Sequence, residues 1–357
     1  MAAALATAAA PRAVAAATDG VLASTVPLDR LRPAATLGHE YKIARTATSP
    51  AYWWLLKSAG TNSDTLSWRG GITFTGNVYR NGHEPITAAF QAILKPACAA
   101  RPTCAVDAGM NAGFYALLFA AMGCYVAAYE VQDEYVQLAT LSTRLNGFSD
   151  RIDIRNLAVG ASTGGRAHIV NPEGGGGTKV ASSKAEDATG LPIFSLDDLL
   201  EARWLRTAAT CAGQAIAALK LDVEGFELNA FAGLRRALSQ RRICNVIFEY
   251  GPKSRWALHR QTRVDGISTL NELWEYGYEI RLIHSFPPGS KLKVLLAHPN
   301  ATRWAQVRAS GYIYSRVPRE ELPMLTSVSS DVNLWAALPN EPSCQAYTPA
   351  AIHATTT

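Results

Sequence analysis

The sequence predicts an α/β protein with a doubly wound, mostly parallel sheet of seven strands, preceded by an irregular N-terminal extension. Short apolar runs of strand length alternate with helix-length segments through the central part of the chain. A glycine-rich turn, Gly109–Gly113, follows the first run, and a second motif, Asp222–Glu227, follows the fourth. In a doubly wound sheet the carboxyl ends of the first and fourth strands are adjacent, and ligands bind there. We therefore expect the two motifs to face each other across one crevice.

The apolar runs predict seven strands in the main part of the chain. In chain order they cover residues 104–106, 124–129, 151–159, 215–221, 243–248, 278–283 and 312–317. Helices are expected at residues 84–95, 114–122, 133–145, 195–200, 227–238 and 267–276. Asn146-Gly147 is a stop signal for the third of these helices. Ser195, with Asp198 three residues on, is a candidate N-cap for the fourth.

Three segments flank or interrupt this alternation. Residues 51–56, which include two tryptophans, are expected to form a short helix packed on the main domain, as a structural extension or a lid. A hairpin is expected over residues 168–180, with four glycines at its tip. The tail from Ser327 onward is expected to be loop or disordered. The predicted organisation is an extension over residues 1–67, a domain over 68–325 and a tail over 326–357.

Length and composition limit the class of protein. The 357 residues suit one large domain with extensions or two small ones, and 48% hydrophobic residues can bury a sizeable core. No run of 18 or more apolar residues occurs, so we expect no membrane span. A net charge of +5 is too small to indicate a nucleic-acid partner by itself. Composition leaves the oligomeric state open.

The first residues of the chain have the composition of a targeting segment. Met1–Thr18 is rich in alanine, contains Arg12 and has no acidic residue. This composition is compatible with a transit peptide for a chloroplast or mitochondrion. The alternative is a disordered tail, and in that case we expect the protein to be cytoplasmic.

The six cysteines and seven histidines do not form a metal-binding pattern. Cys104, Cys124 and Cys244 begin expected strands, where a buried cysteine behaves as a small apolar residue. The sequence contains no Cys-x-x-Cys pair, and its histidines are scattered without ligand spacing. We therefore expect no zinc site and assign no metal ligands.

The turn after the first strand has features of a nucleoside-binding site. Glu130 closes the second expected strand, 21 residues after Gly109. An acidic residue at this spacing in a βαβ unit accepts hydrogen bonds from a ribose. A dinucleotide fingerprint has its second glycine where this turn has Asn111, because the backbone there approaches a pyrophosphate. S-adenosylmethionine has a ribose, no phosphate and a polar amino-acid tail, so the turn Gly109-x-Asn111-x-Gly113 favours it over NAD.

Four segments together resemble a known family. They are Asp107–Tyr115, Asn156–Gly160, Ser195–Leu200 and Leu219–Glu227. In order and spacing, over roughly residues 80–322, they are similar to the FkbM-type S-adenosylmethionine-dependent methyltransferases. One departure is Met110, where the family usually has a smaller residue. The resemblance implies the Rossmann-like class I methyltransferase fold, S-adenosylmethionine as cofactor, and O-methylation of a small molecule or a sugar.

The expected site residues lie around the carboxyl ends of the strands. The cofactor-binding set is Asp107, Gly109, Asn111, Gly113, Glu130, Asn156 and Asp222, and the catalytic set is Asp222 and Glu249. Glu130 is expected to hold the ribose hydroxyls and Asn156 the adenine edge. Asp222 is the first candidate for the general base, because an alcohol is a poor nucleophile, or it fixes the methionine amine. Glu249 is the second candidate, for base work or acceptor binding.

Two other functions remain open at this point. An NAD-dependent oxidoreductase would share the sheet, although Asn111 and the lack of a third spaced glycine count against it. A non-catalytic binding protein that retains the methyltransferase fold is the other alternative, because a fold does not determine a function. Nothing in the sequence specifies the acceptor.

Overall fold

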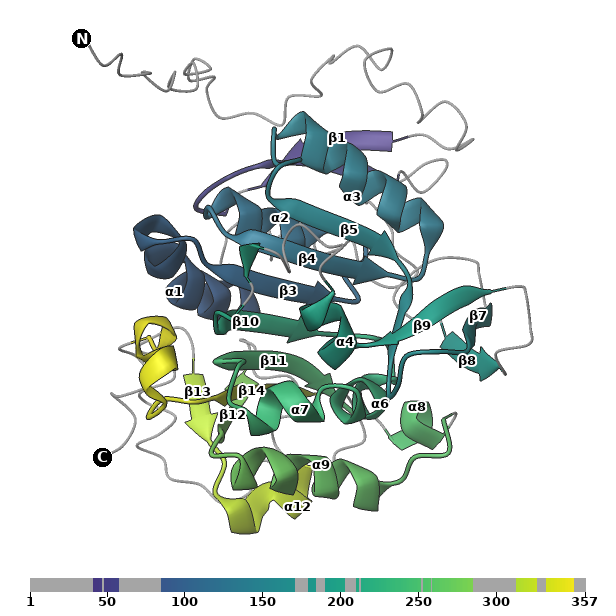
Figure 1. Cartoon of the computed structure of the whole chain (residues 1–357), viewed down its shortest axis with the longest axis vertical. Helices are drawn as coiled ribbons and strands as arrows, with labels where there is room; N and C mark the ends of the chain where they lie inside the picture. The colour runs from purple at the N-terminus through teal and green to yellow at the C-terminus, as the bar shows by residue number, and fades with distance from the viewer. Residues whose placement is uncertain are drawn as a thin grey trace, which may run out of the picture.

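The centre of the protein is an eight-stranded sheet, seen in the computed structural model of the chain (Figure 1). The structure describes residues 41–46, 48–57, 85–170, 179–183, 190–202, 210–211, 213–251, 253–257, 259–284, 313–325 and 332–349. The sheet has the order β13-β12-β14-β11-β10-β3-β4-β5. In chain order its strands are β3 (Cys104–Ala108), β4 (Tyr125–Glu130), β5 (Ile152–Asn156), β10 (Ile216–Leu221), β11 (Asn245–Tyr250), β12 (Glu279–His284), β13 (Ile313–Arg316) and β14 (Val332–Ala337).

The strand order is that of a doubly wound sheet. From β3 the chain steps outward to β4 and β5, then returns to place β10 and β11 on the other side of β3. These neighbours are all parallel, whereas β14 runs antiparallel to both β11 and β12, and β13 antiparallel to β12. The predicted fold class is therefore confirmed, and each of the seven expected strands contributes to this sheet.

The eighth strand, β14, lies in the C-terminal tail. The tail was expected to be loop or disordered, so that part of the prediction is wrong. β14 is inserted between β11 and β12 and pairs with both. Trp335 is 1% exposed, and its indole Nε1 donates to Asn245 Oδ1 at 3.0 Å. The six residues of β14 follow a polar stretch, and so short a run is only a weak indication of a strand in the sequence. Its strand conformation is stabilised by hydrogen bonds to two partners that are distant in sequence.

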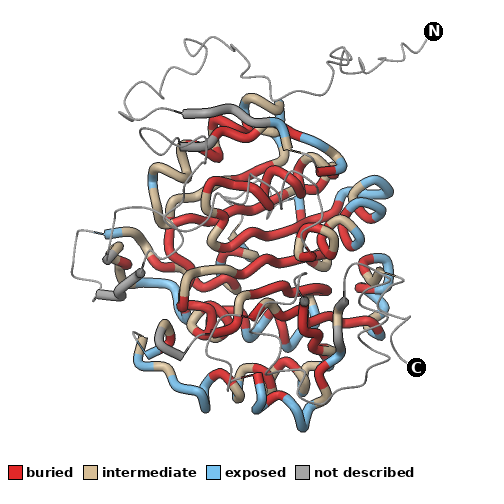
Figure 2. The backbone as a smooth tube through the Cα atoms, turned by 180° about the vertical axis from the view of Figure 1, so that it is seen from behind, coloured by how far each residue is buried: buried red, intermediate tan, exposed pale blue. Residues whose placement is uncertain are grey.

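Helices pack along the sheet, whose strands are buried over most of their length (Figure 2). They are α1 (Pro85–Ala100), α2 (Phe114–Ala121), α3 (Asp133–Leu145), α4 (Leu196–Glu201), α6 (Glu227–Ala232), α7 (Arg235–Ser239), α8 (Lys253–Ala257) and α9 (Arg263–Glu275), with short turns η4 (Arg319–Glu321), α12 (Leu322–Leu325) and η5 (Pro342–Tyr347). α3 has the bounds that the sequence predicted, and the Ser195 hydroxyl caps α4 by accepting from Asp198 N at 3.1 Å. The single helix expected over 227–238 is broken into α6 and α7. A side chain on Gly233, between them, would collide with the Gly160 carbonyl. No helix in the described part of the chain is long and apolar enough to cross a membrane.

A second, four-stranded sheet has the order β6-β9-β7-β8. Its strands are β6 (Ala158–Gly160), β7 (Arg166–Val170), β8 (Lys179–Ser183) and β9 (Leu191–Ser195). β7 and β8 form the expected antiparallel hairpin, although the four glycines of its tip lie outside the described residues. The strand expected over residues 151–159 is divided at Leu157 between the two sheets.

The segment expected as a short helix near residue 53 is instead a strand, so that prediction is wrong. β2 (Trp53–Lys57) pairs antiparallel with β1 (Tyr41–Arg45). Consecutive aromatic residues favour strands, and an antiparallel partner satisfies their backbone groups. The Trp54 indole donates to Ala112 O at 2.8 Å, and the Tyr52 hydroxyl donates to Phe114 O at 2.6 Å. These side chains therefore brace the glycine turn. The alanine-rich start of the chain lies outside the described residues.

All six cysteines form disulfides, which the sequence analysis did not anticipate. The pairs are Cys98–Cys124, Cys104–Cys211 and Cys244–Cys344. Interpreting the cysteines as small apolar residues was correct about burial, since Cys104, Cys124 and Cys244 are each at most 1% exposed. It was incomplete about chemistry, because the partners are 26 to 107 residues away in sequence and the fold alone brings them together.

A truncation tests whether the tail is part of the domain. A chain ending at Leu325 lacks β14 and the partner of Cys244, so β11 and β12 lose a shared ladder. We expect it to show no cooperative thermal transition by circular dichroism. A matched chain ending at Pro349 keeps β14 and η5 and should unfold like the full-length protein. A cooperative transition in the shorter chain at an unchanged temperature would contradict the role of β14.

Candidate active site

The glycine turn and the motif after β10 are in direct contact. Gly109 has φ +77°, and a Cβ there would lie 1.7 Å from the carbonyl oxygen of Asp222. Asp222 N in turn donates to Ala108 O at 3.0 Å. Only glycine fits at position 109, because it needs both a left-handed backbone and a surface without a side chain. The two motifs, which were expected to face each other across a crevice, thus lie in direct contact at the carboxyl ends of β3 and β10.

Glu130, the last residue of β4, holds the turn through its carboxylate. Its Oε2 accepts from Asn111 N at 2.9 Å and its Oε1 from Gln132 N at 2.9 Å. Asn111 has φ +53°, and its Oδ1 accepts from Ala112 N at 2.7 Å. Burial raises the pKa of Glu130, and the two backbone N–H groups oppose that rise. The side chain that was expected to bind a ribose thus also fixes the backbone at position 111.

Asn156 and Gly113 shape the two sides of this turn. Asn156, the last residue of β5, donates from Nδ2 to the carbonyls of Glu130 and Val131, at 3.0 Å each. Its amide nitrogen is therefore engaged in positioning the end of β4. Gly113 has φ +86° and precedes α2, and a Cβ there would meet the Ala139 Cβ at 2.8 Å. The close approach of α2 to α3 depends on that glycine.

A buried lysine links β3 to the end of β10. Lys220 Nζ lies 3.1 Å from Asp222 Oδ2 and 3.8 Å from Asp107 Oδ1, and it donates to Gly109 O at 3.5 Å. Burial acts to lower the pKa of Lys220, but the charges of Asp222 and Asp107 outweigh it, so the pKa is raised. The Tyr115 ring lies 5.3 Å from the ammonium. The lysine is therefore held in its charged form.

Asp107 is fully buried behind the turn. Its Oδ2 accepts from Ala116 N in α2 at 2.8 Å. Burial raises the pKa of Asp107 to about 6, against the opposing charge of Lys220. The residue expected in the cofactor-binding set thus lies inside the protein. It acts on the turn by anchoring the start of α2 and the lysine.

The loop between β10 and α6 is closed by Glu227. Glu224 and Gly225 have positive φ values of 55° and 98°. Glu227 Oε1 accepts from Val223 N at 3.1 Å and from Gly225 N at 3.0 Å. Burial raises the pKa of Glu227 to about 8, in opposition to those backbone N–H groups. These contacts agree with the expected structural role of Glu227.

Arg255 connects two acidic side chains on the other side of this loop. Its Nη1 lies 2.8 Å from Glu249 Oε2, at the end of β11, and 3.0 Å from Glu224 Oε2. The side chain of Glu249 is 19% exposed and that of Asp222 39% exposed, so both carboxylates reach solvent. The two expected catalytic residues are thus accessible, and each is paired with one cation.

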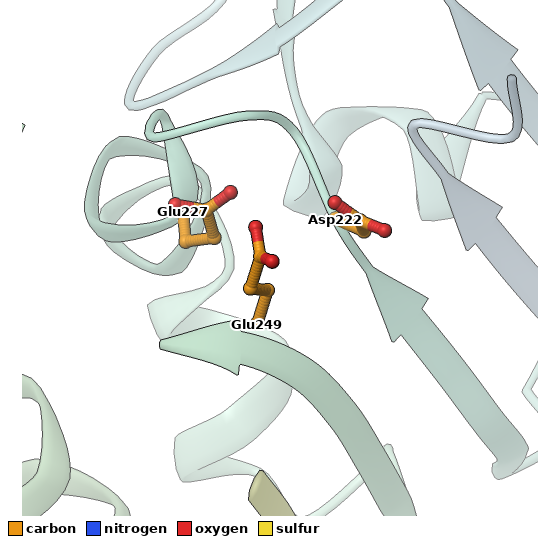
Figure 3. A group of neighbouring side chains, drawn as sticks. All are labelled: Asp222, Glu227 and Glu249. Carbon is orange, nitrogen blue, oxygen red and sulfur yellow. The ribbon is translucent and has the colours of Figure 1, made fainter. Parts of the chain in front are cut away.

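Asp222, Glu227 and Glu249 come together from three different elements. One carboxylate oxygen of each lies within 4.8 Å of the others (Figure 3). No metal ligands were expected from the sequence, because its cysteines and histidines have no ligand spacing. A carboxylate cluster of this kind has no fixed spacing in the sequence, since the carboxyl ends of two strands and the start of a helix build it.

Two cations of the site, Lys220 and Arg255, were not expected from the sequence. Lys220 is a lone charge inside the apolar run Ile216–Leu221, which is a signal that a buried charge needs a partner. Arg255 stood among other basic residues in the sequence and carried no such signal. Its partners, Glu224 and Glu249, become apparent only when the loop and the strand are placed in the fold.

One family model matches the part of the chain that contains these residues. Residues 107–280 match the model of the Methyltransferase FkbM domain. The matched range includes the glycine turn, the Asp222–Glu227 motif and Glu249. It therefore agrees with the resemblance seen in the sequence. None of the curated proteins compared with the chain matches it.

Solved methyltransferase structures overlap this chain only in part. The METTL16 MTase domain is 18% identical over 55% of this chain, with a TM-score of 0.30. A SAM dependent methyltransferase from Agrobacterium tumefaciens is 10% identical, covering 80% of this chain and 68% of its own, at 0.36. The StiE O-MT is 9% identical, covering 73% of this chain and 75% of its own, at 0.33. The chain spans 59% of the length of the METTL16 domain. At these TM-scores the superpositions carry no weight for function.

Replacing Gly109 with alanine tests the contact between the two motifs. Gly109→Ala places a methyl group on the Asp222 carbonyl, and we expect a loss of more than about 4 kcal/mol in unfolding free energy. Gly147→Ala is the matched control, because Gly147 has φ +71° with nothing within 4 Å. The control should lose only about 1–2 kcal/mol, from backbone strain. Equal losses in denaturant unfolding would show that the close approach is absent.

The burial of Asp107 predicts a pH dependence of stability. Its pKa in the fold, about 6, exceeds the ordinary value of 3.8, so the folded protein binds this proton more tightly than the unfolded chain does. The stabilisation is complete below about pH 4 and is lost as the pH rises through 6. Relative to Asp107→Asn, the wild type should lose about 2 kcal/mol between pH 4 and pH 7. Denaturant titrations of both proteins measure this difference, and parallel curves would contradict it.

Proposed function

We propose that this chain, whose residues 107–280 match the Methyltransferase FkbM domain model, uses S-adenosylmethionine as methyl donor and methylates a hydroxyl oxygen of a small molecule or a sugar. The observation that carries the proposal is the convergence of Asp222 and Glu249 beside the glycine turn, at the carboxyl edge of the sheet. An alcohol acceptor is helped by a carboxylate that acts as a general base, because the hydroxyl proton must be removed during transfer.

The proposed donor site lies along the ends of β3, β4 and β5. Glu130 binds the ribose hydroxyls with the acceptor capacity that remains beside its two backbone N–H partners, since a carboxylate offers about four lone-pair positions. Asn156 lies next to it and lines the adenine side. Asp222 faces the positive amine and sulfonium of the donor, where a carboxylate is electrostatically favourable. Lys220 compensates part of the charge of Asp222 and fixes its direction.

The proposed reaction is an in-line displacement at the methyl carbon. The hydroxyl oxygen of the acceptor forms the new bond to carbon, and the bond from sulfur to carbon breaks with its electron pair remaining on sulfur. The hydroxyl proton passes to a carboxylate, Asp222 first and Glu249 second. Placing the two reactants in line supplies much of the rate enhancement, because it removes the entropy cost of bringing them together.

Asp222→Asn separates the chemical role from the fold. The amide keeps the size of the side chain but removes its charge and basicity, so turnover should fall by about 10²–10⁴-fold. Mass spectrometry follows the methyl gain on a panel of sugars, lipids and polyketide-like alcohols, and circular dichroism checks the fold. Asp133→Asn, on the exposed start of α3, is the matched control and should retain full activity.

Donor binding is measured separately by calorimetry with S-adenosylmethionine, S-adenosylhomocysteine and NAD. A folded Asp222→Asn protein with wild-type turnover would remove Asp222 from the mechanism. Binding of NAD in preference to both adenosyl ligands would overturn the proposed function itself.

A further inference from the structure

Three carboxylates at the carboxyl edge of the sheet are arranged like the ligands of a cation. Asp222 follows β10, Glu249 lies in β11, and Glu227 is the first residue of α6. One oxygen from each lies within 4.8 Å of the other two. In Figure 3 the side chains of Glu227 and Glu249 extend toward each other and lie beside Asp222. Like charges this close repel one another unless a cation or a proton lies among them.

Glu227 supplies an independent sign of a missing partner. Its residue is 1% exposed, and its Oε1 is fully engaged with two backbone N–H groups. Its Oε2 is buried and has no hydrogen-bond partner among the described residues. A buried polar atom without a partner is costly and rare, so such an atom indicates a ligand. This oxygen is on the same carboxylate that lies within 4.8 Å of Glu249 and Asp222 through one of its oxygens.

Two cations of the described residues contact this group, and neither pairs with Glu227. Lys220 is shared between Asp222 and Asp107, and Arg255 is shared between Glu249 and Glu224. Within the part of the chain that the structure describes, no lysine or arginine forms an ion pair with Glu227. Glu227 is therefore a buried acidic group without a partner cation among the described residues, at a place where solvent screening is weak.

We propose that Asp222, Glu227 and Glu249 bind a hard divalent cation. A set of carboxylate oxygens is the donor type that Mg²⁺, Mn²⁺ and Ca²⁺ prefer. Opposite oxygens around Mg²⁺ are about 4.0–4.2 Å apart and those around Ca²⁺ about 4.6–5.2 Å, from their usual bond lengths. Oxygens within 4.8 Å of one another fit that range after small side-chain shifts. Beside the proposed cation, Lys220 contacts Asp222 Oδ2 at 3.1 Å and Arg255 contacts Glu249 Oε2 at 2.8 Å.

The role of the cation rests on the proposed function. A divalent cation beside the donor methyl would bind the acceptor hydroxyl and lower its pKa, so that its proton leaves to water before transfer. The alkoxide oxygen then forms the bond to the methyl carbon, and sulfur keeps the electron pair of the bond that breaks. In this form Asp222 and Glu249 act as ligands rather than as the proton acceptor.

Binding of Mn²⁺, followed by the loss of the free-ion signal in electron paramagnetic resonance, tests the site without an activity assay. Full-length protein is treated with EDTA, dialysed and titrated with Mn²⁺, and Mg²⁺ and Ca²⁺ are added as competitors. We expect one Mn²⁺ per chain. Glu227→Gln keeps an acceptor for Val223 N and Gly225 N but removes the charge, so it should weaken binding by at least about tenfold. Glu249→Gln should do the same.

Glu272→Gln is the matched control, because Glu272 is also a glutamate paired with an arginine, Arg235, but is not one of the three clustered carboxylates. It should bind Mn²⁺ like the wild type. The proposal is overturned if folded wild-type protein binds no Mn²⁺ at millimolar concentration, or if all three variants bind it equally. Methyl transfer at an unchanged rate after EDTA treatment would support the proposed function and overturn the role of the cation in it. One bound Mn²⁺ with no transfer to any acceptor would support the cation site and count against the function.

Discussion

The rest of the candidate site depends on one buried ammonium. Lys220 lies between Asp107 on β3 and Asp222 after β10, and it also contacts the carbonyl of Gly109. A buried ion pair contributes little net stability, because the desolvation of its charges offsets their attraction. It does select one arrangement, since removing either partner leaves an unpaired charge. That arrangement connects β3 and β10, the first and fourth strands of the predicted order, at the point where the strand order reverses.

The two edges of the sheet have different tasks. At the carboxyl edge lie the glycine turn, Glu130 and the three clustered carboxylates, with left-handed residues and buried charges that cost stability. At the amino edge, Cys104 begins β3, Cys124 precedes β4 and Cys244 precedes β11. All three are in disulfides. The disulfides at the amino edge stabilise the strands, and the carboxyl ends of the same sheet hold the clustered carboxylates close together. This division is consistent with a site whose residues are chosen for chemistry rather than for packing.

Much of the fold could be predicted because its signals are local. Each apolar run became a strand, and Asn146-Gly147 ended α3 where expected. The errors arose where distant partners decide the structure. β14 depends on β11 and β12, β2 depends on β1, and the disulfides join cysteines far apart in the chain. In the site, Gly109 and Asp222 were placed correctly from their motifs, whereas Arg255 and the convergence of Glu227 with Glu249 required the fold.

The disulfides also decide how this protein has to be made in the laboratory. Two of them join residues 100 and 107 positions apart, so they form only when the folded chain brings distant cysteines together. Six cysteines allow fifteen pairings, and a reducing bacterial cytosol favours none of them. Production by secretion into the periplasm or from a eukaryotic host, with a disulfide isomerase present, is the route that this covalent framework requires. A preparation whose thiol count is not zero would be a mixture of chains, and its binding constants would describe that mixture.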